Sequence, residues 1–489
     1  MNWSQVLPEA VAEGAGWQPV AAVTADSRAV VPGTLFFALT GHRADGHDYI
    51  GEAVAAGAIG VVAERSVAVP PETPLAVHPE ARRLLGEAAA RLHRHPSGAL
   101  PVVAVTGTNG KTTVAWLLAG LFEAGGVVGT LGWGRAGRHG TLQPSAETTP
   151  DAVTLQDRLA RLRADGVTGV AMEASSHGLD QQRLAGTALA GAVWTNLSPE
   201  HLDYHRDLAA YRAAKARALA RPELGFAVVN ADDPEVAHFA GAVAPDVALW
   251  RFGLAAGDVR VERVTAGAGG IDLVAATPAG AVTVRSALVG AVNVPNLLAA
   301  VATGLALGLD AATVGERLSA VPPVPGRMED VGTTPAGAQV WVDFAHTADA
   351  LERTLAGARE LTAGRLWCVF GCGGERDTAK RTAMGEVAGR LCDQVVLTSD
   401  NPRSEDPEAI IDAIAAGLGG RAALREPDRA AAIGRALAGA AAGDGVVIAG
   451  KGHEDYQEVA GRRLPFSDRE AVRQWLAPAG EAVGHDDPG

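Results

Sequence analysis

The sequence predicts an α/β protein of several domains, and three observations lead to this prediction. The chain has 489 residues, whereas a typical domain has roughly 150, so we expect about three domains. Short apolar runs alternate with helical patterns over residues 99–326 and again beyond residue 326, which is typical of parallel strands joined by crossover helices. A β-prone run, residues 101–105, leads directly into a glycine-containing loop and a helix. We therefore expect a central parallel sheet of the phosphate-loop ATPase type.

The first hundred residues have the pattern of a small α/β unit. Residues 33–39 and 59–63 are expected strands, with a helix over about 49–56 between them. A second helix, near residues 79–95, ends at a predicted linker, Pro96-Ser97-Gly98. Polar side chains in the loops of this unit are candidates for holding a polar ligand, and ordinary turn chemistry is the alternative. These loops are 26–28 and 41–47.

The loop after residues 101–105 follows the order that a phosphate site needs. Gly107 and Gly110 let backbone N–H groups turn inward, and the helix N-terminus adds positive potential. Lys111 is placed to reach the outer phosphates, and the Thr112 hydroxyl is a ligand for Mg²⁺. The motif is shorter than the usual phosphate loop because Val105 stands where that motif has its first glycine, so a purely structural glycine turn is the alternative. The predicted nucleotide-binding residues of the loop are Gly107, Thr108, Asn109, Gly110, Lys111, Thr112 and Thr113.

Polar residues also follow two later apolar runs. Glu173 comes directly after residues 170–172, and His201 and His205 lie in the polar loop after residues 192–194. Because ligands of parallel sheets bind at the carboxyl ends of the strands, Glu173 is well placed to bind Mg²⁺ beside the phosphate loop. A salt bridge is the alternative for Glu173, and loop capping is the alternative for the histidines.

The second half of the chain continues the alternation. Residues 254–284 have the pattern of a short β-rich stretch, and Asn293-Val294-Pro295-Asn296 is expected to cap a helix that runs to about Leu307 and ends at Gly308. The proline-rich segment 321–326 is a second predicted linker. Each expected strand beyond it is followed by a polar or glycine-rich loop. These strands are 340–342, 366–370, 394–397 and 446–449.

Composition restricts the partners of the protein. The formal net charge of −14 argues against a general binder of nucleic acid or of anionic membranes, so we expect small-molecule substrates, no nucleic acid and no membrane. Cys368, Cys372 and Cys392 are an odd set without metal-ligand spacing, and we expect reduced thiols. No secretory pattern follows Met1, and no apolar run approaches about 20 residues. We therefore expect a cytoplasmic protein, and we expect it to be a monomer.

Seven short strings occur in a fixed order along nearly the whole chain. They are Gly107–Thr112, Glu147–Pro150, Glu173–Leu179, Thr195–Leu197 with His201–His205, Gly326–Glu329, Asp400–Arg403 and Gly450–Asp455. In this order and with these residues the sequence resembles the Mur ligase family, most closely its MurE branch, whose members add the third amino acid to the peptidoglycan precursor. One such string arises easily by chance, but seven in order make a highly specific resemblance.

The resemblance implies three domains and a reaction. Residues 1–98 would bind the UDP-muramoyl substrate, residues 99–326 would bind ATP, and residues 327–489 would form a Rossmann-like domain that binds the incoming amino acid. In the implied reaction, which uses ATP and Mg²⁺, ATP phosphorylates the D-Glu γ-carboxylate of UDP-N-acetylmuramoyl-L-Ala-D-Glu. The amine of a diamino acid then attacks the acyl phosphate, which leaves an amide and free phosphate. Ligation of L-lysine or another diamino acid, a folylpolyglutamate-type ligase and a nucleotide-dependent switch are the alternatives.

The resemblance also assigns roles to individual residues. The catalytic residues would be Lys111, Glu173, His201 and Lys215, and Lys215 matches the position of a carbamylated lysine in the family. The Mg²⁺ ligands are Thr112, Glu173, His201 and Lys215. Further contacts to ATP are assigned to Asn296, Arg327, Asp343 and His346. Contacts to the UDP-muramoyl-peptide are assigned to Ser27, Thr148, Thr149, Ser175, Gln181 and Arg183. Contacts to diaminopimelate are assigned to Arg376, Asp400, Asn401, Arg403, Gly450 and Glu454.

Two details of the strings bear on specificity. The family often has Tyr and Pro where this chain has Phe344 and Ala348, so a phenol hydroxyl and a proline restraint near the nucleotide are missing. Arg403 occupies the position that accompanies meso-diaminopimelate in this family, and a guanidinium grips the second carboxylate of that amino acid with two parallel hydrogen bonds. The alternative is that Arg403 pairs with Glu405 or Asp406 in a solvated loop.

Overall fold

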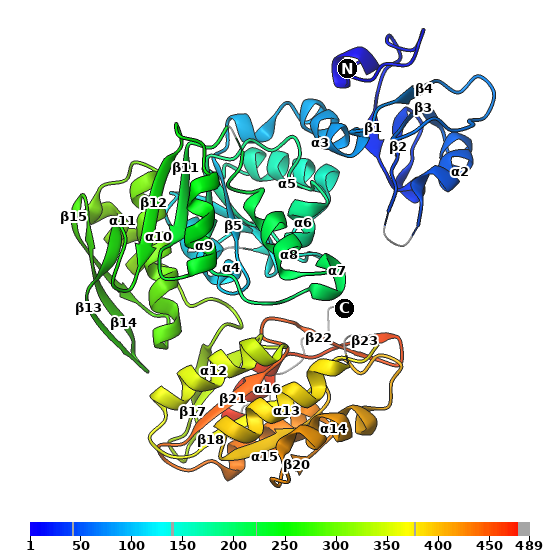
Figure 1. Cartoon of the computed structure of the whole chain (residues 1–489). Helices are drawn as coiled ribbons and strands as arrows, with labels where there is room; N and C mark the ends of the chain where they lie inside the picture. Colours follow the sequence, from blue (N-terminus) through cyan, green and yellow to red (C-terminus); the bar gives the residue numbers. More distant parts are fainter. Residues whose placement is uncertain (42–43, 138–140, 222, 376–377, 478–489) are drawn as a thin grey trace, which may run out of the picture. The chain divides into compact units, whose positions relative to one another are not determined.

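The computed structural model describes residues 1–41, 44–137, 141–221, 223–375 and 378–477 (Figure 1). The chain divides into two compact units, and each is described by itself. Unit 1 comprises Met1–Glu262, Val274–Thr283 and Pro295–Ala320, and unit 2 comprises Arg263–Leu273, Val284–Val294 and the chain from Val321 onward. The α/β class is confirmed, whereas the domain boundaries expected at residues 98 and 326 remain predictions.

The first hundred residues form a four-stranded parallel sheet in the order β1-β2-β3-β4. Alternate residues of β2 face opposite sides: Phe36 packs in a cluster with Ile50 of α2, whereas Phe37 packs in another with Leu84 of α3. This alternation buries the strand on both faces, as a run of five apolar or small residues predicts. The elements are α1 (Trp3–Val6), β1 (Ala22–Thr24), η1 (Ser27–Ala29), β2 (Thr34–Ala38), η2 (Gly46–Tyr49), α2 (Ile50–Ala55), β3 (Ala58–Ala63), β4 (Leu75–Val77) and α3 (Ala81–Leu92).

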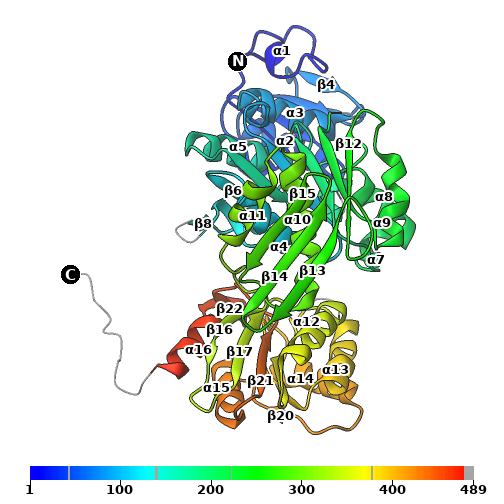
Figure 2. The same cartoon turned by 90° about the vertical axis from the view of Figure 1, so that its left-hand side faces the viewer.

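An eleven-stranded sheet follows, in the order β15-β14-β13-β12-β11-β10-β5-β9-β6-β7-β8. Its central strands, from β11 to β6, are parallel, and β5 is buried at every position. Figure 2 shows β13, β14 and β15 side by side, so the expected β-rich stretch extends this sheet. The strands are β5 (Val102–Thr106), β6 (Gly125–Gly129), β7 (Gly132–Arg135), β8 (Leu142–Gln143), β9 (Gly169–Glu173), β10 (Gly191–Trp194), β11 (Phe226–Asn230), β12 (Ala248–Gly253), β13 (Val259–Gly267), β14 (Gly270–Thr277) and β15 (Gly280–Ser286).

Helices alternate with the central strands, as the apolar periodicity predicts. The segment expected to cap a helix lies at the N-terminus of α10: Asn293 directly precedes the helix, which starts at Val294 and takes Pro295 and Asn296 into its first turn. Proline is well tolerated there because the first-turn N–H groups have no partner within the helix. The helices are η3 (Pro96–Gly98), α4 (Lys111–Ala119), α5 (Ala152–Ala164), α6 (Ser176–Asp180), α7 (Leu202–His205), α8 (Leu208–Ala216), α9 (Pro234–Phe239), η4 (Ala240–Ala242), η5 (Ala291–Asn293), α10 (Val294–Ala306) and α11 (Ala311–Ser319).

Unit 2 contains a six-stranded sheet in the order β16-β17-β21-β18-β19-β20, in which every pair except β16–β17 is parallel. Alternate residues of β18 face two apolar clusters: Phe370 packs in the cluster of α12, α13 and α14, and Trp367 in that of α15. The elements are β16 (Glu329–Thr333), β17 (Gln339–Asp343), α12 (Ala348–Leu361), β18 (Leu366–Phe370), α13 (Ala379–Leu391), β19 (Gln394–Leu397), α14 (Pro407–Ala415), η6 (Ala416–Leu418), β20 (Leu424–Arg425), α15 (Arg429–Gly439), β21 (Gly445–Ala449), β22 (Tyr456–Val459), β23 (Arg462–Pro465) and α16 (Asp468–Leu476).

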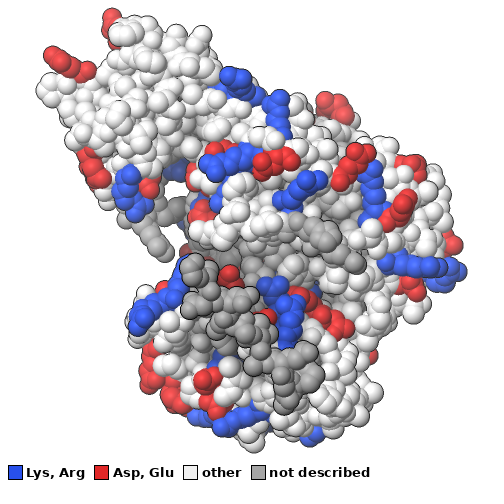
Figure 3. Space-filling model, turned by 180° about the vertical axis from the view of Figure 1, so that it is seen from behind, with Lys and Arg blue, Asp and Glu red and all other residues white. Residues whose placement is uncertain are grey.

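The surface carries charges of both signs. Acidic and basic side chains are interspersed among neutral ones on the face seen in Figure 3. Within the described ranges, none of the helices has the length and apolar character needed to cross a bilayer.

Candidate active site

The phosphate loop lies between β5 and α4, at the carboxyl end of the central strand. Gly107 and Gly110 have φ angles of +143° and +83°, which favour glycine. A Cβ on Gly107 would lie 1.9 Å from Thr195 Oγ1, and one on Gly110 would lie 2.5 Å from Asn296 Oδ1. Both glycines are therefore required by close packing as well as by backbone conformation. Gly110 at the N-cap of α4 has no side chain, so no side-chain cap competes with an anion at this helix N-terminus.

Two lysines from different helices donate to the same carbonyl of this loop. Lys111 Nζ lies 3.0 Å from the Gly107 oxygen and 2.8 Å from the Thr108 oxygen, and Lys215 Nζ lies 2.6 Å from the Gly107 oxygen. Lys215 is buried, with its ammonium 4.6 Å from the centre of the Tyr211 ring. Burial, together with the nearby charge of Lys111, lowers the pKa of Lys215 well below its ordinary value.

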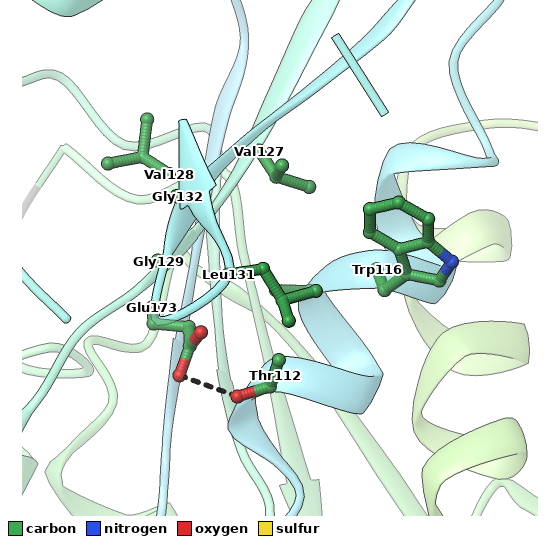
Figure 4. A pocket seen from close by; sticks show the side chains of 9 residues that line it. Thr112, Trp116, Val127, Val128, Gly129, Leu131, Gly132 and Glu173 are labelled. Carbon is green, nitrogen blue, oxygen red and sulfur yellow. Dashed lines mark hydrogen bonds between the residues drawn. The ribbon is translucent and has the colours of Figure 1, made fainter. Parts of the chain in front are cut away.

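Glu173 ends β9 and faces α4. Thr112 Oγ1 donates to Glu173 Oε2 at 3.1 Å, as the dashed line in Figure 4 shows. The Thr130 amide donates to Glu173 Oε1 at 2.7 Å, so the carboxylate is held from two sides. Both residues were predicted as Mg²⁺ ligands, and the structure brings their side chains into contact. A pocket opens beside the pair, and its lining residues are Thr112, Ala115, Trp116, Val127, Val128, Gly129, Leu131, Gly132 and Glu173 (Figure 4).

His201 belongs to a cluster of aromatic rings. The ring centres of His177 and His201 are 4.8 Å apart, and those of His205 and Tyr211 are 5.3 Å apart. Burial, assisted by the positive charges of Lys111 and Lys215, lowers the pKa of His201. A lowered pKa favours the neutral imidazole, which is the form that binds a metal.

The residues assigned to the muramoyl-peptide form one hydrogen-bonded group in unit 1. Thr149 Oγ1 donates to the Glu173 carbonyl at 2.8 Å and receives a hydrogen bond from the Ser175 amide. Arg183 donates twice to Gln181 Oε1, at 3.0 and 2.8 Å, and once to the Thr149 carbonyl at 2.6 Å. Thr148 reaches the same group through Thr130, at 3.1 Å between their hydroxyl oxygens. Ser27 lies apart from this group, on η1, where it donates to Glu52.

Of the four further residues assigned to ATP, Asn296 belongs to unit 1, and the others belong to unit 2, namely Arg327, Asp343 and His346. Asp343 ends β17, and its two carboxylate oxygens accept hydrogen bonds from the Met328 and Ala345 amides at 2.7 and 2.8 Å. Burial raises the pKa of Asp343, against the opposing charge of Arg327. The Arg327 guanidinium lies 4.7 Å from the centre of the Phe344 ring, so Phe344 supplies a stacking face where the family often has a phenol. His346 is exposed, with its ring 4.7 Å from that of Phe344.

The loops after β19 and β21 meet in unit 2, and they carry the residues assigned to the amino acid. Asn401 Nδ2 donates to Glu454 Oε2 at 3.1 Å. A Cβ on Gly450 would lie 2.5 Å from Asp400 Oδ2, so only glycine allows this approach. Arg376 lies outside the described residues.

The contacts of Arg403 exclude the alternative that was considered for this residue. Its side chain does not pair with Glu405 or Asp406: it donates to the Gly374 carbonyl, and its Nε lies 3.4 Å from Glu458. Its backbone forms an isolated bridge to Val459, so the hairpin of β22 and β23 fixes the loop. Glu405 instead pairs with Arg381, at 2.9 Å, and the Arg403 side chain is only 16% exposed.

The sequence pattern missed several residues that hold the site together. Thr130 holds Glu173, and its only signal was a glycine-rich stretch after an apolar run. Asn196 was quoted only as part of a string, yet its side chain accepts from the Asn109 amide at 2.9 Å and thereby shapes the phosphate loop. Lys451 was likewise quoted only as part of a string, yet it is fully buried between Asn401 and Glu454.

The side chains assigned to Mg²⁺ suit a metal ion only in part while Lys215 is unmodified. Among the described residues, no three His, Cys, Asp or Glu side chains converge on one point. The hydroxyl of Thr112, the carboxylate of Glu173 and the imidazole of His201 are donors that Mg²⁺ accepts, but an unmodified Lys215 is a cation that would repel it. The site therefore fits Mg²⁺ if Lys215 carries an oxygen-bearing group.

Comparisons with known proteins agree with this geometry. Residues 105–304 match the Mur ligase middle domain, residues 326–452 match the Mur ligase, glutamate ligase domain, and residues 19–95 match the Mur ligase family, catalytic domain.

Full-length relatives support the same assignment. The UDP-N-acetylmuramoyl-L-alanyl-D-glutamate–2,6-diaminopimelate ligase of Alkalilimnicola ehrlichii is 46% identical over 477 residues, which is 94% of this chain and 95% of that protein. The enzyme of the same name from Chromobacterium violaceum is 44% identical over 475 residues, again 94% and 95% of the two chains. A solved structure of a ligase with this name superposes with a TM-score of 0.71 at 35% identity, covering 97% of this chain and 98% of the other. The chain belongs to the Mur ligase family and is an ATP-dependent ligase.

Proposed function

We propose that the protein adds meso-diaminopimelate to the D-Glu γ-carboxylate of UDP-N-acetylmuramoyl-L-Ala-D-Glu, with ATP as the phosphate donor, in peptidoglycan synthesis. The main observation behind this proposal concerns the two loops that follow β19 and β21 in unit 2, which we call the loop cluster. Arg403 and Glu454 lie on these loops, and hydrogen bonds tie the loops together. A guanidinium and a carboxylate are complementary to the carboxylate and ammonium at the far end of diaminopimelate. The names of the relatives support the same substrate.

The chemistry explains the need for ATP. A carboxylate is a poor acyl donor because its leaving group would be oxide, so phosphorylation must precede attack by the amine. The approach of a carboxylate to a triphosphate brings two anions together. Lys111 and the positive potential at the N-terminus of α4 oppose this repulsion.

We assign the Mg²⁺ site to Thr112, Glu173, His201 and a carbamylated Lys215. Mg²⁺ would neutralise phosphate charge during transfer. Carbamylation requires a neutral amine, and the lowered pKa of Lys215 supports the presence of that form. The modification would also turn the buried amine into a group with oxygen ligands, which Mg²⁺ accepts.

Location and assembly belong to the same proposal. The three cysteines are buried and free of disulfides, which supports a reducing compartment such as the cytoplasm. We propose that the protein acts there as a monomer.

Arg403 tests the choice of amino acid. If L-lysine occupied the site, the Arg403 guanidinium would lack the second carboxylate that diaminopimelate supplies. The cost would be roughly 1–3 kcal/mol, or about ten- to a hundredfold in selectivity. We expect a strong preference for meso-diaminopimelate over L-lysine in kcat/KM, and loss of most of that preference in Arg403→Ala. Arg462→Ala is the control, because Arg462 is an exposed arginine of the neighbouring strand β23.

Equal kcat/KM for the two amino acids in the unmodified protein would refute the choice of diaminopimelate. A preference that survives in Arg403→Ala would refute the role of Arg403. Amide formation with a folate and glutamate, instead of the muramoyl substrate, would favour the folylpolyglutamate alternative.

A further inference from the structure

Lysine is rare in this chain. Of the 42 Lys and Arg residues, only those at 111, 215, 380 and 451 are lysine. Two of the four, Lys111 and Lys215, donate to the Gly107 carbonyl of the phosphate loop. Lys451 has no exposed surface, and neither the reaction nor the amino-acid contacts proposed above use it. A chain that otherwise supplies its positive charges with arginine keeps a lysine here, in the centre of the loop cluster.

The Lys451 ammonium meets three acceptors from the two loops. Its Nζ lies 3.0 Å from Asn401 Oδ1, 3.1 Å from Glu454 Oε2 and 3.7 Å from Asp400 Oδ1. The first two contacts are hydrogen bonds, whereas the third is a longer ion-pair contact with Asp400. The neighbouring charges are of opposite sign, which allows the cation to be buried.

These contacts fix the orientations of the Asn401 and Glu454 side chains. Asn401 Oδ1 accepts from Lys451 and from the Glu458 amide at 2.9 Å, so the amide orientation of Asn401 is set and its Nδ2 points to Glu454. Glu454 Oε2 thus accepts from two donors, Lys451 and Asn401. Both donors contact the same oxygen, so neither of them occupies Oε1.

We propose that Lys451 is a positioning residue that sets the selectivity of this enzyme for an amino acid with a second ammonium group. The inference rests on the proposed function. Lys451 holds the carboxylate of Glu454 in one orientation, so that Oε1 accepts a hydrogen bond from the far ammonium of the substrate. It does so from beneath the site and has no contact of its own with the substrate.

The geometry also explains why the residue is lysine. An ammonium is a compact point donor, whereas a guanidinium is planar and wider, with its donors in a fixed fork. Lys451 is fully buried, so the wider side chain of an arginine at this position would displace Asn401 or Glu454.

The test compares two amino acids that differ only at the far ammonium: meso-diaminopimelate and L-2-aminopimelate, which keeps both carboxylates. The ratio of their kcat/KM values is measured for the unmodified protein, for Lys451→Met, and for Arg462→Met, which removes an exposed charge from the nearby strand β23. The KM for ATP and the melting temperature are measured in parallel. We expect the unmodified protein and Arg462→Met to prefer meso-diaminopimelate at least tenfold, and Lys451→Met to lose most of this preference with less than a twofold change in the KM for ATP.

A preference that Lys451→Met retains within twofold would overturn the inference. If Lys451→Met does not fold, Lys451→Arg keeps the charge, and the expected result is again a loss of preference; an unchanged ratio would overturn the inference equally. Failure of the proposed function gives a different result: the unmodified protein would then release no phosphate in the presence of either amino acid and the muramoyl dipeptide.

Discussion

At the scale of single residues, the phosphate loop is organised around one carbonyl. Lys111 and Lys215 both donate to the Gly107 oxygen, although they come from helices more than a hundred positions apart in sequence. The role of Lys111 followed from its place in a strand, loop and helix pattern. The position of Lys215 did not, because an isolated helical lysine has no local signal, and only the resemblance singled it out.

Lys111→Ala is expected to lower turnover by at least a hundredfold. An oriented cation at a phosphoryl transfer contributes about 3 kcal/mol or more, and no neighbouring arginine is placed on this loop to replace it. The measurement is phosphate release at saturating ATP, dipeptide and diaminopimelate. Arg135→Ala, at the end of strand β7, is the matched loss of charge and is expected to retain activity. Turnover of Lys111→Ala within a few-fold of the unmodified protein would exclude the phosphate-loop assignment.

At the scale of elements, the strand ends determine the site. Strands 366–370 and 394–397 were predicted with the bounds that the structure shows, because continuous apolar runs between polar turns mark buried parallel strands. The side-chain network between Asn401, Glu454 and the β22–β23 hairpin was not predictable, because it depends on pairing between segments about 50 residues apart. The segment expected to cap α10 lies at the start of this helix, where a first-turn proline is well tolerated.

The turn at Gly107 gives a prediction for the loop. Gly107→Ala places a Cβ 1.9 Å from Thr195 Oγ1 at a φ of +143°, so we expect a loss of about 2–4 kcal/mol in stability and a rise of at least tenfold in the KM for ATP. Gly166→Ala is the control: its φ is also positive, at +76°, but no atom lies within 4 Å of the added Cβ. It is expected to cost about 1 kcal/mol and to leave the KM unchanged. Denaturant titration and ATP kinetics distinguish the two, and equal effects would contradict the packing argument.

Helix α15 supplies a second matched pair. Arg429 makes two hydrogen bonds to Asp468, at 2.7 and 2.8 Å, and both side chains are fully buried. Arg429 also donates to the Ser399 and Ala449 carbonyls, at 3.2 and 2.9 Å, and so ties together the ends of β19 and β21. Removing one partner of a buried pair leaves an uncompensated charge.

We therefore expect Arg429→Met to destabilise the protein by about 3–5 kcal/mol. Arg435→Met, on the same helix, breaks a pair with Glu426 in which the arginine is 56% exposed, and is expected to cost less than about 1 kcal/mol. Urea unfolding followed by circular dichroism measures both changes. A small effect of Arg429→Met would show that the buried pair does not stabilise the strand ends.

At the scale of the whole molecule, the candidate residues divide between the two units. The phosphate loop, Glu173 and Lys215 belong to unit 1, whereas Asp343, Arg403 and Glu454 belong to unit 2. The sequence predicted candidates for each part of the reaction, and several of them, such as Glu173, Asp343 and Arg403, lie at or after the carboxyl end of a strand. The supporting contacts required the structure, since they join residues that no spacing rule connects.

The most direct measurement is the dependence of phosphate release on each substrate, with mass analysis of the product. The protein is mixed with ATP, Mg²⁺, UDP-N-acetylmuramoyl-L-Ala-D-Glu and meso-diaminopimelate, and each component is omitted in turn. We predict that phosphate accumulates only in the complete mixture and in equal amount to a UDP-muramoyl tripeptide that contains diaminopimelate. Steady phosphate release without the dipeptide and the amino acid, or release without formation of the tripeptide, would contradict the assignment and favour a nucleotide-dependent switch.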